Sequence, residues 1–97
     1  MRGPEGKIQD AVIKYARGKG LLCKKNEVGR FNVSSGWPDF TIYGPEELCF
    51  FIEFKRPGGK LTELQAHVKL TLEQRGFEVY VIDNVNDGRS VIDKECA

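Results

Sequence analysis

Two carboxylates and a lysine stand in the most apolar part of this sequence. Asp39 follows Pro38 at the start of one apolar run, and Glu53 and Lys55 lie at the end of the next, with only Phe54 between them. Side chains two residues apart on a strand project from the same face, so Glu53 and Lys55 are expected to point together. Acidic pairs beside an ammonium group are typical of sites that hydrolyse phosphate esters with a metal ion.

A predicted β-hairpin brings these side chains to one place. Residues 39–43 and 48–54 have the composition of strands, and the turn GPEE joins them. Because the strands of a hairpin are antiparallel, Asp39 at the start of the first should lie beside Glu53 near the end of the second. The sequence therefore predicts two carboxylates and a lysine at one end of a sheet.

A divalent cation would hold this acidic pair together. Mg²⁺ is suited to it, because this ion takes oxygen ligands and keeps waters that can be activated. The backbone carbonyl of Phe54 is the leading candidate for a third protein ligand. The Lys55 ammonium could orient an attacking water or offset charge that builds on a phosphoryl group.

Each of these residues also has an ordinary structural explanation. Glu53 and Lys55 could form a surface ion pair, and Asp39 could be a turn residue after a proline. Gln65 completes a capping box with Thr62, which would use its side chain to close a helix start. Its position relative to the apolar residues of that helix also places Gln65 on the inner face, towards the strand end that carries Lys55.

Two further residues, Glu5 and Trp37, are open to two interpretations, and His67 has one. Glu5 lies three residues before Ile8, which places it near the apolar stripe of the first helix and facing the core. It could equally be an acidic residue favoured in a first helical turn by the helix dipole. Trp37 could stack on a base, but a packed lid over the hairpin is the simpler interpretation. His67 is expected to be a solvated helix residue.

The remaining segments predict a mixed α/β fold. Both faces of 48–54 are apolar over most of its length, which indicates a central strand covered on both sides. The leucine and valine positions of the second helix, Leu64, Val68 and Leu72, form its predicted buried stripe. The expected order is a helix (5–17), strands at 21–28, 39–43 and 48–54 in an antiparallel meander, a helix (62–75), a strand (77–83), and a short terminal helix (91–97) after the turn NDG. Helices should flank both faces of the four-stranded sheet.

Composition narrows the class of protein. The 97 residues form one predicted domain, 1–97. The start lacks the apolar run of a signal peptide and no stretch approaches the about 18 apolar residues that span a bilayer, so we expect no membrane association and a cytoplasmic location. Three scattered cysteines and one histidine favour reduced thiols and no zinc site. Residues 1–60 hold 11 Lys and Arg against 7 Asp and Glu, and residues 61–97 hold 4 against 7, so the two parts carry +4 and −3. This asymmetry allows one basic face that could follow a phosphate backbone.

Taken together, these segments resemble one known family. The residues that carry the resemblance are Glu5, Gly36-Trp37-Pro38-Asp39, Glu53-Phe54-Lys55 and the segment Pro57-Gly58-Gly59-Lys60-Leu61-Thr62-Glu63-Leu64-Gln65. In this order they are similar to the VRR-NUC family, the virus-type replication-repair nucleases of the PD-(D/E)XK superfamily. The resemblance runs from residue 5 to about residue 83.

The resemblance implies a restriction-endonuclease-like core and a set of roles. It implies metal binding by Asp39 and Glu53, a supporting acidic role and a candidate ligand role for Glu5, the catalytic lysine role for Lys55 and a site-supporting role for Gln65. The implied cofactor is Mg²⁺ or Mn²⁺, and the implied products carry 5′-phosphate and 3′-hydroxyl ends. The short chain resembles the stand-alone phage and bacterial members, which are similar to Holliday-junction resolvases and would act in the host cytoplasm.

The expected function is that of a structure-specific DNA endonuclease. We expect it to cut four-way junctions as a homodimer and to use no small-molecule substrate. The first helix and the loop GRFNVSSG, residues 29–36, are the candidate dimer surfaces. Two alternatives remain open at this stage: a module of the same fold that binds branched DNA without cutting it, and an exonuclease or nicking enzyme of the same chemistry.

Overall fold

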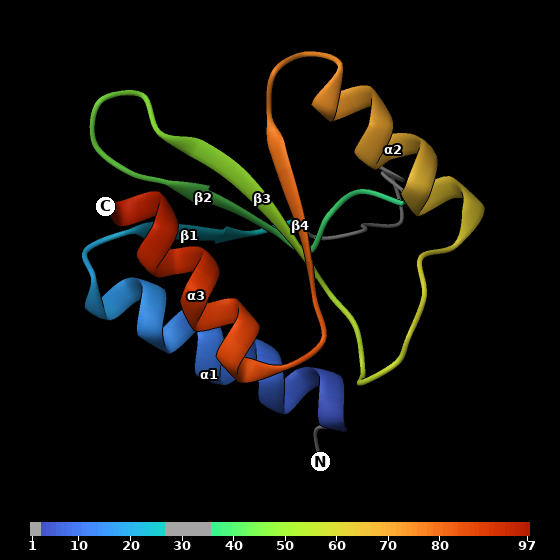
Figure 1. Ribbon diagram of the computed structural model, residues 1–97, viewed down its shortest axis with the longest axis horizontal. Helices are drawn as coiled ribbons and strands as arrows, with labels where there is room; N and C mark the ends of the chain where they lie inside the picture. The colour runs from blue at the N-terminus through green and yellow to red at the C-terminus, as the bar shows by residue number, and fades with distance from the viewer. Residues whose placement is uncertain (1–2, 27–35) are drawn as a thin grey trace.

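The fold is that of a mixed sheet between helices, given by a computed structural model that describes residues 3–26 and 36–97. Figure 1 shows the elements in chain order. They are α1 (Pro4–Gly18), β1 (Leu22–Lys25), β2 (Phe40–Tyr43), β3 (Cys49–Phe54), α2 (Glu63–Glu73), β4 (Glu78–Ile82) and α3 (Val85–Cys96). The predicted α/β class and the predicted element order are confirmed. No helix within the described ranges has the length and apolar character needed to cross a membrane.

The sheet has the order β1-β2-β3-β4, with β3 between an antiparallel and a parallel neighbour. Strands β1, β2 and β3 form the expected antiparallel meander, in which Phe40 pairs with Ile52. Strand β4 then returns parallel to β3 after the crossover through α2, as a parallel connection requires. The carboxyl end of β3 therefore lies beside the start of β2 on one side and the end of β4 on the other.

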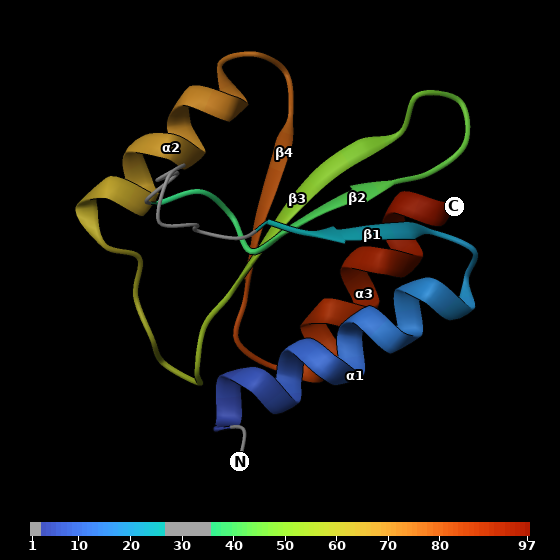
Figure 2. The same cartoon turned by 180° about the vertical axis from the view of Figure 1, so that it is seen from behind.

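Helices cover both faces of the sheet, as the two apolar faces of β3 predicted. Figures 1 and 2 show α1 and α3 together on one face and α2 on the other. The larger core lies under α1 and α3 and contains Phe50, Ile52 and Phe54 of β3. A smaller cluster lies under α2, where Phe51 packs against Leu72 and Val79. Successive side chains of β3 thus enter different cores, and Glu53 shares the α2 face with Phe51.

The C-terminal helix is longer than the sequence predicted. We expected the residues NDG to form a turn before a short helix, but they lie in the first turns of α3. The side chain of Asn84 caps the helix by accepting a hydrogen bond from the Asp87 N–H at 2.8 Å. Gly88 is buried against α1, where an added Cβ would lie 2.4 Å from Cγ2 of Val12. This glycine therefore permits close packing of two helices, and local sequence cannot distinguish that role from a turn.

The buried stripe predicted for α2 is correct only in part. Leu72 is buried and Val68 packs against it, but Leu64 is 47% exposed. The approach of the chain at Gly36 explains the position of Leu64, because a Cβ on Gly36 would lie 2.8 Å from Cγ of Leu64. Gly36 also has a φ of 82°, a conformation that favours glycine. Leu64 thus faces the chain segment that leads to Asp39, at the edge of the smaller core.

Candidate active site

The hairpin places Asp39 and Glu53 opposite each other, as expected. The ladder pairs Phe40 with Ile52, and one step further along the same register come Asp39 and Glu53. Oδ2 of Asp39 accepts a hydrogen bond from the Phe54 N–H at 2.7 Å, which fixes its carboxylate against the end of β3. Burial raises the pKa of Asp39, while this hydrogen bond opposes the rise. Asp39 is thus a half-buried carboxylate, oriented by the backbone of the strand that carries Glu53.

Glu53 is a buried carboxylate among like charges. Its side chain is only 7% exposed. Burial and the neighbouring Asp39 carboxylate raise the pKa of Glu53 from 4.5 to about 8. Lys55 offsets part of this effect, since its Nζ lies 3.9 Å from Oε2 of Glu53 and its side chain is 15% exposed. Because both side chains are largely shielded from water, this pair differs from the exposed ion pair that Glu-x-Lys can form.

Gln65 contacts both the start of α2 and the acidic pair, the two positions that its place in the sequence allowed. Its Oε1 accepts a hydrogen bond from the Thr62 N–H at 2.9 Å, and its own N–H donates to Oγ1 of Thr62 at 3.1 Å, so the capping box is present. Its Nε2 simultaneously donates to Oε2 of Glu53 at 3.2 Å. The amide has separate donor and acceptor atoms, so one side chain can join the start of α2 to the acidic pair.

Glu5 lies elsewhere than the helical spacing suggested. It is exposed in the first turn of α1 and does not face the core. Its charge nevertheless raises the pKa of both Asp39 and Glu53, so it lies within electrostatic reach of the acidic pair. Glu5 lies three residues before Ile8, the first buried apolar residue of α1, and therefore falls in the exposed first turn of the helix.

The arrangement of ligand atoms suits a partly hydrated divalent ion. Within residues 3–26 and 36–97, no group of three or more His, Cys, Asp and Glu side chains is placed to enclose a metal. The candidate donors are two carboxylates, and Mg²⁺ is commonly held by one or two carboxylates with waters and substrate oxygens. In an extended strand the N–H and C=O of one residue point to the same side, so the Phe54 carbonyl faces the side on which its N–H meets Asp39. Two raised carboxylate pKa values favour a cation between them.

Asn26 supports the site and was missed by the sequence analysis. Its Nδ2 donates to the carbonyl of Pro38 at 3.1 Å and to Oγ1 of Thr41 at 2.9 Å. Its backbone N–H donates to the carbonyl of Asp39 at 2.7 Å. These bonds hold the residues on both sides of Asp39. The sequence placed Asn26 inside the predicted strand 21–28, whereas β1 ends at Lys25, and the pairing of Asn26 with Asp39 depends on the register of the two strands.

Trp37 adopts the simpler of the two positions expected for it, and His67 adopts the one expected position. Trp37 is 39% exposed and meets Phe51 edge to face, with 6.1 Å between the ring centroids, so it partly covers the smaller core as a lid. His67 is exposed on α2, as expected for a solvated helix residue. Neither side chain is part of the acidic pair.

The similarities to known proteins agree with this fold. Residues 5–86 match the VRR-NUC domain, so the chain belongs to the VRR-NUC family. A solved structure described as a VRR_NUC domain superposes with a TM-score of 0.81 at 24% sequence identity, covering 95% of this chain and 97% of the other. No curated protein matches the chain. The family is one of nucleases, which typically use divalent metal ions and act on DNA.

Proposed function

We propose that this protein is a Mg²⁺- or Mn²⁺-dependent endonuclease that hydrolyses phosphodiester bonds in DNA. The observation that carries the proposal is the pairing of Asp39 with the buried Glu53 at one end of the sheet, with Lys55 beside them. Asp39, Glu53 and the Phe54 carbonyl would hold the metal ion, and Glu5 would add negative charge from the first turn of α1. When bound, such an ion supplies water activation and neutralises charge on the phosphate.

The remaining side chains have distinct tasks in this proposal. Lys55 lies next to Glu53 and carries an ammonium that can orient the attacking water or offset charge on the phosphoryl oxygens. Gln65 holds Oε2 of Glu53 through its Nε2, which limits the orientations of that carboxylate. The products would carry 5′-phosphate and 3′-hydroxyl ends.

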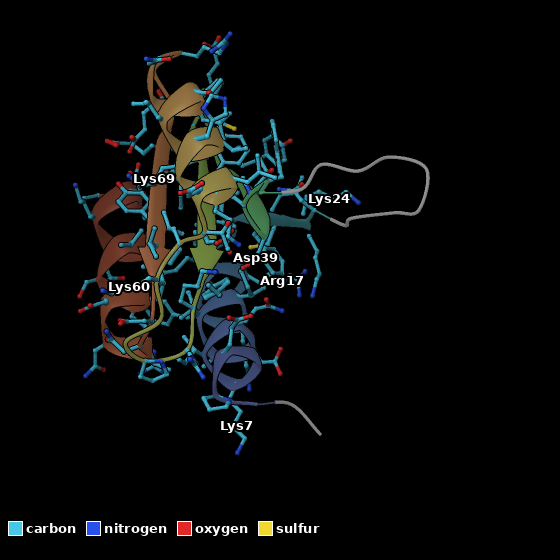
Figure 3. All side chains as sticks on the ribbon, turned by 90° about the vertical axis from the view of Figure 1, so that its right-hand side faces the viewer. Lys7, Arg17, Lys24, Asp39, Lys60 and Lys69 are labelled. Carbon is cyan, nitrogen blue, oxygen red and sulfur yellow. The ribbon has the colours of Figure 1, made fainter. Side chains whose placement is uncertain are left out.

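The surface around the acidic pair suits a polyanion. Figure 3 shows Lys7, Lys24 and Lys60 on different sides of Asp39 when this side faces the viewer, together with Lys69, whose Nζ is paired with Oε2 of Glu73 at 2.8 Å. Cations around an acidic centre attract the phosphate backbone, while the carboxylates keep that backbone from binding the centre without a metal ion. This arrangement supports DNA as the substrate.

The proposal extends to branched DNA and a homodimer acting in the cytoplasm. A net charge of +4 over residues 1–60 provides few phosphate contacts, and a two-fold pair would double them. Two sites related by a two-fold axis would also match the symmetry of a four-way junction. Of the two candidate dimer surfaces, α1 belongs to the described residues, and residues 29–35 of the loop lie outside them.

Cleavage assays with three variants test the chemistry. Asp39→Asn and Glu53→Gln should each abolish cleavage and weaken Mn²⁺ binding in calorimetric titration, because each removes a proposed ligand. Lys55→Ala should abolish cleavage and retain Mn²⁺ binding, since an ammonium is not a ligand. Cleavage at the wild-type rate by Asp39→Asn or Glu53→Gln would overturn the metal assignment.

The same assay separates the alternative functions. Labelled four-way junctions and linear duplexes should be incubated with and without Mg²⁺ or Mn²⁺. Internal cuts that require metal support an endonuclease, whereas binding without products would indicate a DNA-binding module. Products shortened stepwise from an end would indicate an exonuclease.

A further inference from the structure

A basic groove lies between α1 and α3, away from the acidic pair. Its volume is about 630 Å³, and its lining consists of Ala11, Lys14, Tyr15, Gly18, Lys19 and Arg89. Three of these residues are cations and none is acidic, which decides the kind of ligand that the groove would accept. Figures 1 and 2 both show α1 and α3 side by side along this part of the fold.

Two of the three cations in the groove lie against one aromatic ring. Nζ of Lys19 lies 5.2 Å from the centre of the Tyr15 ring, and the guanidinium carbon of Arg89 lies 5.4 Å from it. Asp93 marks the edge of the groove: the Tyr15 hydroxyl donates to its Oδ1 at 2.6 Å, and Nζ of Lys19 is 3.8 Å from the same oxygen. The lining itself holds three cations and no carboxylate, so it carries a positive excess.

The positive charge of the groove continues along the solvent-facing side of α1 towards its first turn. Lys7, Ala11, Lys14 and Gly18 follow one another at spacings of four, three and four residues, so they share a face of the helix. Glu5 projects from the opposite side of α1 to Lys14, so only the axial distance of about 20 Å between Glu5 and Gly18, at about 1.5 Å per residue, describes how far the groove lies from the active-site end. A duplex covers that distance in about six base pairs at about 3.4 Å per phosphate on each strand.

We propose that this groove binds the phosphate backbone of a DNA duplex arm that extends from the active site along α1. This inference rests on the proposed function, because it takes DNA as the substrate. Arg89 and Lys14 would contact phosphate oxygens, and Lys7 would contact the arm nearer to the site. The groove would add affinity and orient the arm without reading its sequence.

Charge argues against a second copy of the chain in this groove. A two-fold interface places the same surface on both partners, so it would bring Lys14, Lys19 and Arg89 towards their own equivalents. Like charges placed opposite each other at an interface are unfavourable. A polyanion relieves that repulsion, and we therefore assign this face of α1 to DNA rather than to a dimer contact.

Binding measurements in the Glu53→Gln background test the proposal without cleavage. Fluorescence anisotropy with a labelled duplex of about 16 base pairs should be recorded over a range of salt concentrations. Adding Lys14→Gln and Arg89→Gln should weaken binding about tenfold or more at about 0.1 M salt, and should reduce the slope of log K against log salt by about 2. Each single substitution should reduce the slope by about 1.

A matched control removes the same charge elsewhere. Arg75→Gln with Lys94→Gln lowers the net charge equally, but Arg75 donates to the carbonyl of Thr71 on α2 and Lys94 lies over the Tyr80 ring. This pair should leave the salt slope close to that of the background. Equal effects of the two double variants, or no effect of the groove variant, would overturn the proposal. A change of mass in light scattering for the groove variant would instead identify the groove as a contact between copies and would also overturn it. Because binding is measured without cleavage, a failure of the nuclease assignment would be visible separately.

Discussion

The buried carboxylate of Glu53 lies beside other negative charges, and this should make the folding stability of the metal-free protein depend on pH. Its pKa rises from 4.5 to about 8 because of burial and Asp39. A raised acid pKa means that the folded state binds the proton more tightly than the unfolded state. The stability contributed by protonated Glu53 is therefore fully present below about pH 4.5 and is lost as the pH rises through about 8.

Thermal unfolding in EDTA between pH 5 and pH 9 checks this expectation. The Tm of the wild type should fall more steeply than that of Glu53→Gln, with a difference at pH 9 of at least about 4 °C, the shift expected for about 1 kcal/mol in a domain of this size. Mn²⁺ at pH 8 should recover the wild-type loss, because a cation replaces the proton. Parallel plots of Tm against pH for the two proteins would show that the pKa of Glu53 is not raised in the folded state, and would contradict the prediction.

At the scale of the elements, the start of α2 is joined to the acidic pair through Gln65. Thr62→Ala and Gln65→Ala each remove one hydrogen bond of the capping box, and each should lower stability by about 1 kcal/mol. Only Gln65→Ala also removes the bond to Glu53, so it alone should reduce the cleavage rate of the folded protein. The measurement is the rate below the Tm of both variants. Equal rates for the two would mean that Gln65 acts only as a cap.

The end of β1 holds the Asp39 segment through Asn26. Asn26→Ala removes the hydrogen bonds to Pro38 and Thr41 and leaves the buried Thr41 hydroxyl without that partner, at a cost of about 1–3 kcal/mol. We also expect weaker Mn²⁺ binding, because Asp39 loses its support. Tyr80→Phe is the control, since it removes a hydrogen bond to Glu95 on the opposite side of the sheet from α2. Unchanged Mn²⁺ affinity in a destabilised Asn26→Ala protein would restrict Asn26 to a role in folding.

At the scale of the whole molecule, charge is divided unevenly along the chain. Residues 1–60 carry +4 and residues 61–97 carry −3, so a single copy offers a limited basic surface. We expect a symmetric homodimer that prefers a four-way junction to linear duplex. Light scattering at micromolar concentration measures the oligomeric state. Competition between labelled junction and duplex at fixed salt measures the substrate preference. A monomer that cuts both substrates equally would leave a general metal-dependent nuclease.

The sequence alone determined the order of the elements and the central pair. Apolar runs, the GPEE turn and the period of two on β3 were sufficient to predict the hairpin and to bring Asp39 beside Glu53, because these features depend on neighbours in the chain. The capping box of Gln65 was also readable for the same reason. Membership of a nuclease family follows from the order of the same motifs.

Only the tertiary structure decided which of several local possibilities each residue adopts. The contact of Gln65 with Glu53 requires α2 to lie on the face of β3 that carries Glu53, and the support from Asn26 depends on the β1–β2 register. Gly88 lies within α3 and permits the close approach of α1, although its local sequence resembles a turn. Contacts between segments distant in the chain fix these roles, and the energies of packing and burial that select them are absent from any short stretch of sequence.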